Sequence, residues 1–336
     1  MVEIISLKDK EKWNEIVSSM SIFDCYHLNE YHRLDSSGEP FLFYYKDDDS
    51  SIAFPLLLRR ISGTDYCDIS SVYGYPGPIS NSTDLPAKSI RNFQKELLLF
   101  FDSCRVVSAF SRLHPLFSQK TLLVGLNKIE DTSFTIGVDL SLPESVQRAD
   151  YSHSLTYDIK KTIKYGVTLK KAESEADVRS FASIYRETMR RVHAKPYYFF
   201  ADEYFLQFVR TINSTILLAV YQGNVIAGTL YTECNGILQI HLSATKDDFL
   251  NWSPTKYIWD QIRFDGTRRG CHFLHLGGAV CNREDGVSNF KNLFSKKKIE
   301  FKTWKYIHDQ KIYQALSQRK SKKSSSNSDF FPSYRE

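Results

Sequence analysis

Residues 216–231 read ILLAVYQGNVIAGTLY, and this stretch decides the fold. Two apolar runs rich in β-branched residues flank a short turn that contains Gly223 and Asn224. Such a pattern predicts an antiparallel hairpin, with strands over 216–221 and 225–231. A third apolar run, over 237–243, predicts another strand beside them, so an antiparallel sheet is expected in this half of the chain.

The elements around the hairpin follow a recognisable order. A helix is expected before it, over 175–191, and another after the third strand, from Ser253-Pro254 to about Arg269. Proline suits a first helical turn because its missing N–H is not needed there. A strand over 272–276 closes the unit. Helix, antiparallel strands, helix and strand is the element order of an N-acyltransferase module of the GNAT kind.

The first half of the chain repeats this order. A helix is expected over 8–20, a hairpin over 41–58, a helix over 86–102 and a strand over 105–110. Matching elements of the two halves lie about 166–175 residues apart. We therefore expect an α+β protein made of two tandem GNAT-like acyltransferase modules, each a mixed sheet flanked by helices.

The module boundaries are expected at changes in composition. A polar stretch around Pro143 indicates a hinge, which gives module 1 residues 1–145 and module 2 residues 146–306. A C-terminal helix over 307–318 is expected to pack on module 1. The tail, 319–336, is rich in Lys and Ser and is expected to be disordered.

Composition excludes some classes of protein. The 336 residues are 42% hydrophobic and 14% aromatic, which excludes a disordered or fibrous chain. The net charge of +5 is too small to indicate a nucleic-acid binder, but the stretch from Lys296 to Lys323 alone carries +8. That stretch is interpreted as a solvated face, a contact for tRNA phosphates, or a peripheral contact with an anionic membrane.

The six cysteines and the N-terminus indicate the compartment. The cysteines form no C-x-x-C pair, so we expect free thiols in a reducing compartment and no metal site. The first residues lack the charged and apolar regions of a signal peptide, and no window holds the roughly 18 apolar residues of a membrane span. A cytoplasmic protein is expected, with the inner face of the membrane as a further site of action.

The motif with most chemical content lies near the C-terminus. Gly277-Gly278 ends the last strand of module 2, and a short helix is expected after Asp285, which suits a helix N-cap. Phe290 and Phe294 are four residues apart and should face the core, which turns Lys291 toward a cleft or toward solvent. A lysine in a cleft can neutralise the oxyanion of an acyl-transfer intermediate, whereas the alternative is an exposed surface lysine.

This motif resembles the signature of the Fem family of non-ribosomal aminoacyltransferases: Gly-Gly, a loop, Asp-Gly, then Phe-Lys-x-x-Phe. Further similar segments precede it in the family's order. They are the basic helix ending in Gly-Val at 158–167, the Tyr-x-x-Thr-x-x-Arg and Tyr-Phe segments at 185–191, 197–199 and 204–205, and the hairpin turn at 223–224. In the N-terminal half only the element order and the Tyr-Gly-Tyr-Pro-Gly-Pro run at 73–78 are similar.

The resemblance implies specific roles. Fem enzymes have two GNAT-like domains and transfer an amino acid from aminoacyl-tRNA to an amine of a nucleotide- or lipid-linked sugar peptide. By this resemblance Lys291 lies next to the acyl ester, Phe290 shapes the pocket, and Arg190 or Arg191 holds acceptor phosphate. For the two arginines the alternative is an ion pair on the helix surface. The remaining residues assigned to substrate binding are Arg33, Tyr198, His241, Gly277 and Gly278.

Two departures from the family leave the acceptor open. The family's early acceptor-contacting lysine aligns loosely with Arg33, a different cation. The chain also lacks the helical arm that some members use for tRNA, so it resembles the armless subset. Peptidoglycan and other polysaccharide precursors both stay open as acceptors.

A CoA-dependent acyltransferase acting on an amino sugar or nucleotide sugar is the main alternative. Such enzymes place a glycine-rich loop before the helix that starts near Pro254, where backbone amides bind pyrophosphate. Here the loop, 245–252, has no glycine and contains Asp247 and Asp248, which repel anions. Gly74 and Gly77 precede the corresponding helix in module 1, but they lie among prolines that stiffen the turn.

General acid–base candidates are few. His241 and His275 lie in strands and suit core or cleft-lining roles better than a general base. Glu284 and Asp285 are the carboxylates nearest the glycines. An aminoacyl ester is already activated, so a protein base is dispensable.

The sequence therefore predicts an aminoacyltransferase with no bound cofactor and with aminoacyl-tRNA as the donor. The acceptor is expected to be a cell-envelope precursor. Acetyl-CoA is the alternative donor, and a non-catalytic member that only binds glycan precursor is the second alternative.

Overall fold

The computed structural model describes residues 1–126, 128–278, 286–321 and 330–335, and the chain forms two compact units. Unit 1 contains Met1–Thr132 and Glu300–Glu336, and unit 2 contains Ser133–Ile299. The boundaries differ from the expected 1–145 and 146–306, because residues 133–145 belong to unit 2 and residues 300–306 to unit 1. Strand pairing between distant segments causes both differences, as described below.

Unit 1 is built on a mixed sheet in the order β1-β2-β3-β4-β6-β13, with β5 beside β3. Strands β4 and β6 are parallel, and the other pairs are antiparallel. Residues Thr303–Ile307 of β13 pair with β6, which is why this segment belongs to unit 1. The strands are β1 (Val2–Ser6), β2 (Glu39–Lys46), β3 (Ser51–Arg60), β4 (Cys67–Ser70), β5 (Ile79–Ser80), β6 (Val106–Arg112) and β13 (Lys298–Ile307).

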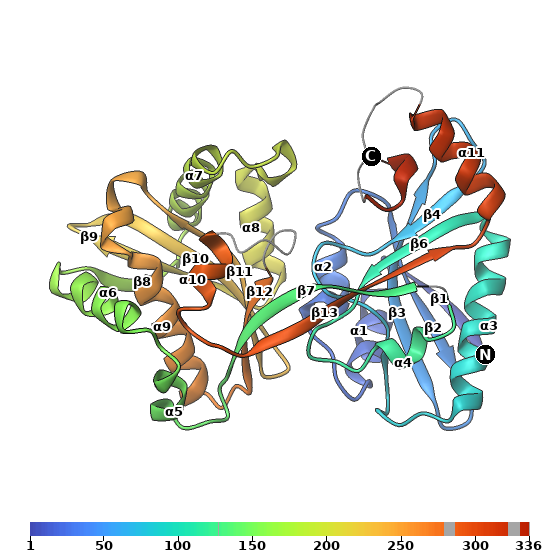
Figure 1. Cartoon of the computed structure of the whole chain (residues 1–336), viewed down its shortest axis with the longest axis horizontal. Helices are drawn as coiled ribbons and strands as arrows, with labels where there is room; N and C mark the ends of the chain where they lie inside the picture. Colours follow the sequence, from blue (N-terminus) through green and yellow to red (C-terminus); the bar gives the residue numbers. More distant parts are fainter. Residues whose placement is uncertain (127, 279–285, 322–329, 336) are drawn as a thin grey trace. The chain divides into compact units, whose positions relative to one another are not determined.

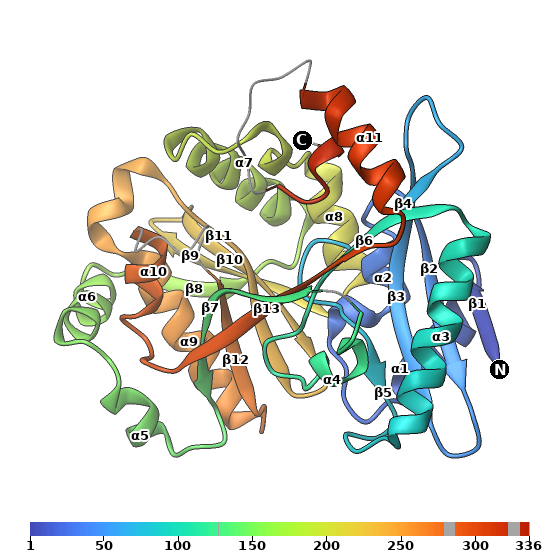
Figure 2. The same cartoon turned by 45° about the vertical axis from the view of Figure 1, so that its right-hand side comes forward.

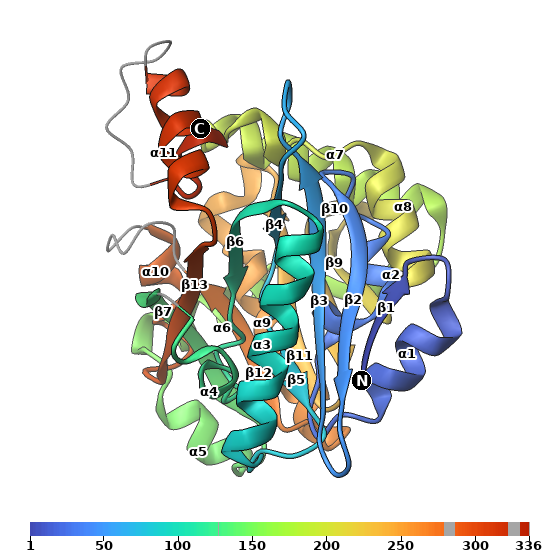
Figure 3. The ribbon, with the colours of Figure 1, turned by 90° about the vertical axis from the view of Figure 1, so that its right-hand side faces the viewer.

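Helices cover both faces of the unit 1 sheet (Figure 3). Phe93, Leu97 and Phe101 recur every four residues along α3, so they form one apolar stripe that packs on one face. Trp13 and Val17 of α1 pack on the other face. The helices are α1 (Lys10–Ser18), η1 (Cys25–His27), α2 (Asn29–His32), α3 (Ala87–Ser103), α4 (Lys120–Leu123), α11 (Gln310–Ser321) and η4 (Ser333–Arg335).

The end of the chain packs on unit 1. Residues 330–335 were expected to belong to a disordered tail, and the structure instead places them against β3, β4 and β6. The Arg335 guanidinium donates to the Asp68 carboxylate at 2.6 Å, and the hydroxyl groups of Tyr334 and Ser108 lie 2.8 Å apart. Asp68 is fully buried and also accepts from Arg59 at 2.7 Å. Charge pairing with a buried carboxylate thus orders a segment whose composition suggests disorder.

In unit 2 the sheet strands follow the order β7-β12-β11-β10-β9-β8. Strands β11 and β12 are parallel, and the other pairs are antiparallel. The expected hairpin is β9–β10, with Gln222 and Gly223 at the turn, both at positive φ as a type I′ turn requires. The strands are β7 (Lys128–Asp139), β8 (Thr168–Lys171), β9 (Ser214–Tyr221), β10 (Asn224–Cys234), β11 (Ile237–Thr245) and β12 (Phe273–Gly278).

Helices α7 and α8 cover one face of the unit 2 sheet, and α6 and α9 cover the other (Figures 1 and 2). Successive side chains of a strand face opposite sides of the sheet, and two neighbouring residues of β10 show this. A Cβ on Gly228 would lie 2.5 Å from Phe181 of α7, whereas the next residue, Thr229, bonds to Trp259 of α9. The helices are α5 (Glu144–Ala149), α6 (His153–Lys164), α7 (Glu175–Arg191), η2 (Pro196–Tyr198), α8 (Asp202–Thr211), η3 (Asp247–Trp252), α9 (Pro254–Arg268) and α10 (Gly286–Lys291).

Among the described residues, no helix combines the length and the apolar character that a transmembrane span requires.

Candidate active site

The two parallel strands of unit 2 pair over only part of their length. Three registered pairs join β11 to β12, and the last is Gln239 with His275. Beyond them β11 continues to Thr245 and β12 to Gly278 with no registered pair between the two strands in the described part of the chain. We call these segments, 240–245 and 276–278, the divergent segments. They leave backbone groups and side chains available for a ligand at this edge.

A β-bulge begins the divergent segment of β11. Leu230 of β10 pairs with Leu242, and Tyr231 pairs with Ile240, so His241 is an extra residue in β11. The extra residue shifts the alternation of side chains by one position. His241 therefore lies on the α8 face, where its ring stacks on Phe208 at 4.7 Å.

His241 was assigned to substrate binding. In the structure its Nε2 lies 2.9 Å from the Tyr204 hydroxyl. Burial lowers the pKa of His241 to about 4, so the imidazole is neutral at pH 7. These contacts are those of a core or cleft-lining histidine and not of a general base. Its role in substrate binding stays a prediction.

Lys291 closes the end of β12. Its Nζ donates to the backbone carbonyl of Gly278 at 2.7 Å, and the residue is only 8% exposed. Gly277 has φ of +78°, and a Cβ there would lie 3.3 Å from the Lys291 Nζ. The glycine thus permits both the left-handed backbone and the close approach of the lysine. The alternative of an exposed surface lysine is wrong, because the ammonium group is held against the strand end.

An aromatic cluster packs around the residues that flank Lys291. The Phe290 ring contacts Trp259 of α9 edge to face at 5.0 Å, and the fully buried Phe294 contacts the same indole at 5.3 Å. Phe290 and Phe294 therefore face the core, as their spacing predicts. That leaves the next residue, Lys291, on the side of β12.

Trp259 also binds two hydroxyl groups, which sequence reasoning missed. Its indole N–H lies 3.0 Å from the Ser243 oxygen and 3.2 Å from the Thr229 oxygen, and these two oxygens are 3.0 Å apart. Ser243 lies in the divergent segment of β11, whereas Thr229 comes from β10. Serine and threonine are common in strands, so only the spatial cluster identifies them.

The Tyr-x-x-Thr-x-x-Arg segment lies along one side of α7 and anchors the end of β11. The Tyr185 hydroxyl donates to the Tyr198 carbonyl at 3.0 Å, and the Thr188 hydroxyl donates to the Thr245 carbonyl at 3.2 Å. Arg191 donates to the same Thr245 carbonyl at 3.1 Å and forms an ion pair with Asp247.

These contacts bear on the predicted phosphate site. Arg191 forms the surface ion pair that was the alternative to phosphate binding. Arg190 is exposed, and its guanidinium group has no bonding partner within the described residues. Tyr198 meets α7 through its carbonyl group. Phosphate binding by either arginine and substrate binding by Tyr198 stay predictions.

Arg33 belongs to unit 1, unlike the other predicted site residues. It follows α2 and is exposed, and its guanidinium donates to the Asn29 side chain at 2.8 Å and to the Leu7 carbonyl at 3.0 Å. These bonds hold the side chain in place, and its role toward an acceptor stays a prediction.

At the position expected for a pyrophosphate loop in unit 2, the 3-10 helix η3 packs against α6. Side chains of α6 bind the carbonyls of η3: Thr162 donates to Trp252 at 2.5 Å and Lys161 to Asn251 at 3.2 Å. The rings of Trp252 and Tyr165 lie 4.4 Å apart above this loop. Asp248, exposed on this loop, has no ion pair within the described residues, and its negative charge disfavours an anionic cofactor there.

Gly74 and Gly77 of unit 1 lie where neighbouring side chains leave no room for a Cβ. A Cβ on Gly74 would lie 2.2 Å from the Tyr26 ring, and one on Gly77 would lie 2.1 Å from the Gln119 amide. Both glycines have positive φ. Close packing therefore explains them without a phosphate ligand.

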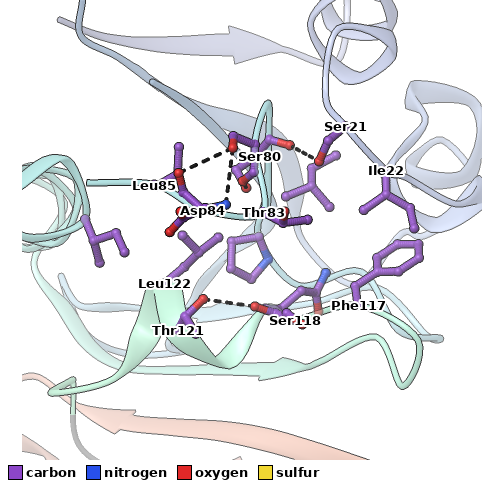
Figure 4. A pocket seen from close by; sticks show the side chains of 15 residues that line it. Ser21, Ile22, Ser80, Thr83, Asp84, Leu85, Phe117, Ser118, Thr121 and Leu122 are labelled. Carbon is purple, nitrogen blue, oxygen red and sulfur yellow. Dashed lines mark hydrogen bonds between the residues drawn. The ribbon is translucent and has the colours of Figure 1, made fainter. Parts of the chain in front are cut away.

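Unit 1 contains a pocket of about 160 Å³ lined mostly by hydroxyl and aliphatic side chains (Figure 4). Some of its hydroxyl groups are bonded within the protein: Ser21 donates to the Ser80 carbonyl at 2.8 Å, and Thr121 to the Ser118 carbonyl at 3.0 Å. Donors already used in this way give the pocket little to offer a ligand. Among the described residues, no cluster of His, Cys, Asp and Glu is arranged to hold a metal ion.

Two predicted features lie outside the described residues. They are the carboxylates Glu284 and Asp285, with the N-cap role assigned to Asp285.

The fold is similar to solved structures over almost the whole chain. A crystal structure of FemX has a TM-score of 0.73 at 10% identity, covering 93% of this chain and 99% of that one. L-PGS from Bacillus licheniformis has a TM-score of 0.61 at 13% identity, covering 93% and 96%. A tandem GNAT protein from the clavulanic acid biosynthesis pathway has a TM-score of 0.52 at 10% identity, covering 91% and 98%.

No protein-family model and no curated protein matches the sequence. The similarities therefore concern the fold. They confirm the expected α+β architecture of two tandem GNAT-like modules and the predicted Fem-like arrangement.

Proposed function

We propose that this protein is an acyltransferase that moves an aminoacyl group from aminoacyl-tRNA to an amine of a cell-envelope precursor, such as one for peptidoglycan or another polysaccharide. The observation that carries this proposal is the buried lysine on the end of β12. Lys291 lies where β11 and β12 diverge, and its ammonium group is fixed by the Gly278 carbonyl. The fold around it is shared with FemX and L-PGS.

The chemistry of this group suits acyl transfer. When an amine attacks an ester carbonyl, negative charge develops on the carbonyl oxygen. A fixed cation in a partly dehydrated site stabilises that charge far better than one in bulk water. Lys291 is held in advance, so little reorganisation is needed at the moment of reaction. Phe290 and Trp259 provide apolar surface beside the position proposed for the acyl ester.

The loop at η3 favours aminoacyl-tRNA over acetyl-CoA as donor. A CoA enzyme needs free backbone amides at the start of α9 to bind pyrophosphate. Here η3 carries Asp247 and Asp248, and Asp248 is exposed and has no ion pair within the described residues, so its negative charge disfavours pyrophosphate. CoA-dependent transfer to an amino sugar is the second candidate, and its support is the fold shared with the tandem GNAT protein.

The basic C-terminal stretch supports a membrane or tRNA contact only weakly. Lys297 pairs with Asp139 at 3.1 Å, and Lys305 pairs with Glu130 at 2.5 Å. Lys302 pairs with Glu300 at 3.0 Å. These three lysines are already neutralised by carboxylates, which supports a solvated face for the part of the stretch that contains them.

The test uses the difference between esters and amides. Purified protein is incubated with tRNA charged with labelled amino acids and with nucleotide-linked and lipid-linked sugar peptides. Mild alkali then releases label that remains as the tRNA ester, whereas label transferred to an amine resists. Alkali-stable label that disappears in Lys291→Met but not in Lys296→Met supports the proposal.

Competing outcomes are separated in the same experiment. Transfer from labelled acetyl-CoA with no transfer from charged tRNA would establish the second candidate. Binding of the sugar precursor with no transfer from either donor would indicate a non-catalytic binding protein.

A further inference from the structure

Ser243 lies in one of the two divergent segments, and Lys291 is bonded to the other through the Gly278 carbonyl. The last registered pair of β11 and β12 is Gln239 with His275. Beyond that pair neither strand has a registered partner in the other within the described part of the chain. The Ser243 oxygen and the Phe290 ring also contact the same indole, that of Trp259. The Ser243 hydroxyl group and the residue next to Lys291 therefore meet at one indole ring.

The hydrogen bonds determine which way the Ser243 proton points. The Trp259 indole can only donate, and its N–H is shared by the oxygens of Ser243 and Thr229. Thr229 is fully buried, and Ser243 is the only acceptor for its proton among the described residues. A buried hydroxyl donor needs an acceptor, so Thr229 donates to Ser243. Ser243 is partly exposed, and its own proton is left to point into the space between the divergent segments.

We propose that Ser243 is a further catalytic residue, which passes a proton to the leaving oxygen of the acyl donor. This inference rests on the proposed transfer from an ester. In the reaction the acceptor nitrogen forms a bond to the acyl carbon, and the bond from that carbon to the ribose oxygen breaks. The ribose oxygen takes the Ser243 proton as it leaves, and the Ser243 oxygen regains a proton from the attacking nitrogen.

The net result is balanced. One proton moves from the acceptor amine to the ribose hydroxyl, and Ser243 ends unchanged. No other reactant is needed. The two donors to the Ser243 oxygen, from Trp259 and Thr229, stabilise the negative charge that grows there while the proton is in transit. Ser243 thus carries out a proton transfer that the substrate or water would otherwise have to perform.

The test exploits the leaving group. A ribose alkoxide must be protonated as it leaves, whereas a thiolate leaves without a proton because thiols are much more acidic than alcohols. Transfer is therefore measured with charged tRNA and with the same tRNA in which the terminal 3′ ester oxygen is replaced by sulfur. The variant Ser243→Ala should lower kcat about 100-fold with the oxygen ester, a usual size for lost proton transfer. With the thioester its kcat should stay within about threefold of the unaltered protein.

A second variant tests the support of the hydroxyl. Thr229→Val keeps the shape of the side chain and removes the donor to Ser243, so it should lower oxygen-ester transfer about fivefold, the value of one hydrogen bond. The indole N–H resonance of Trp259 checks that either variant still folds around the cluster.

Each outcome decides between the possibilities. Equal losses with both donors would show a structural role for Ser243 and overturn the inference while leaving the proposed function intact. Unchanged rates with both donors would overturn it as well. No transfer by the unaltered protein from either donor would instead overturn the proposed function, and this inference with it.

Discussion

The side-chain nitrogen of Lys291 lies 2.7 Å from the carbonyl oxygen of Gly278, thirteen residues earlier in the chain. This single bond joins the helix α10 to the end of the strand β12. It holds a buried cation at the place where β11 and β12 stop pairing, and it fixes the position of the charge before any substrate arrives.

Replacing Lys291 with methionine should lower kcat for acyl transfer by about 100- to 1,000-fold, the usual cost of losing one oxyanion-stabilising group. Methionine keeps the length of the side chain and removes the charge. Lys296→Met is the matched control, because Lys296 is exposed and donates to a backbone carbonyl, that of Asn292, at 2.8 Å. Steady-state kinetics of both variants check this. Equal rates for the two would exclude an electrostatic role for Lys291.

Gly277→Ala should lower both stability and activity, and the same substitution at Gly223 serves to distinguish the two effects. Gly277 and Gly223 have nearly the same φ, +78° and +77°. Alanine in this conformation should cost about 1–2 kcal/mol of unfolding free energy at either position. At Gly223 the new Cβ meets nothing within 4 Å, whereas at Gly277 it meets the Lys291 nitrogen at 3.3 Å.

Only Gly277→Ala should therefore also reduce activity, by displacing the lysine. Urea unfolding and transfer kinetics on both variants test this. Similar activity in the two would show that the lysine tolerates a Cβ at Gly277.

The ion pair of Arg191 and Asp247 should contribute little to stability. Both side chains are partly exposed, at 27% and 52%, so a double-mutant cycle with alanine should give a coupling of about 0.2–1 kcal/mol. Arg190→Ala should leave stability unchanged, because Arg190 is exposed on the same helix. If Arg190 holds acceptor phosphate, this variant should raise KM for the acceptor without changing kcat. A raised KM in Arg191→Ala alone would assign the phosphate contact to Arg191.

The contact between Arg335 and Asp68 should stabilise unit 1. Asp68 is fully buried, and removing one of its two arginine donors leaves its carboxylate less well satisfied. Arg335→Ala should therefore lower the free energy of unfolding by about 1–3 kcal/mol. Arg319→Ala, at an exposed position on α11, is the control and should have no effect. Thermal unfolding of both variants is the measurement, and a neutral Arg335→Ala would show that the end of the chain adds nothing to the fold.

Stability should fall as the pH drops below 6.5. Burial lowers the pKa of His27 to about 4 and that of His32 to about 3, whereas in the unfolded chain both have ordinary values. Between pH 6.5 and 4 the unfolded chain therefore binds more protons than the folded one. Each histidine should then remove about 1.4 kcal/mol per pH unit.

The surroundings of the two histidines support this direction. His27 faces Asp24 and His114, which form a buried pair of their own at 3.0 Å, and it contacts the Pro76 carbonyl at 2.5 Å. His32 packs on the Trp13 ring at 5.1 Å. Urea unfolding at pH 7, 6 and 5 measures the slope, which should be shallower in His32→Asn. His153→Asn, at an exposed position, should leave the slope unchanged, and a pH-independent stability would contradict the prediction.

Local patterns were sufficient for much of the fold. The apolar runs on either side of Gly223 predict the β9–β10 hairpin, and the structure has it, with the turn one residue earlier, at Gln222-Gly223. Pro254 indicates the start of α9 because proline fits a first helical turn. These features depend on residues close together in the sequence, which is why sequence reasoning finds them.

Features that depend on distant partners were not predictable in the same way. Trp304 lies in a stretch assigned to module 2 by its place in the chain, yet its indole donates to the Leu126 carbonyl at 2.8 Å in the core of unit 1. The spacing of Phe290 and Phe294 predicts which way Lys291 turns, but not that Gly278 would bury its charge. Ser243 carries no local signal, because its environment is made by Thr229 and Trp259 from two other elements.

The pairing of β13 with β6 also affects the order in which the protein folds during synthesis. A nascent chain that has been extended to Ile299 contains every residue of unit 2, but unit 1 still lacks Trp304 in its core and the strand Thr303–Ile307 that covers one side of β6. Unit 1 therefore keeps an open sheet edge at this stage, whereas unit 2 can already complete its fold. This is the reverse of the usual N-to-C order of folding. Until Thr303–Ile307 has been made, β6 exposes an unpaired edge to which another chain can add.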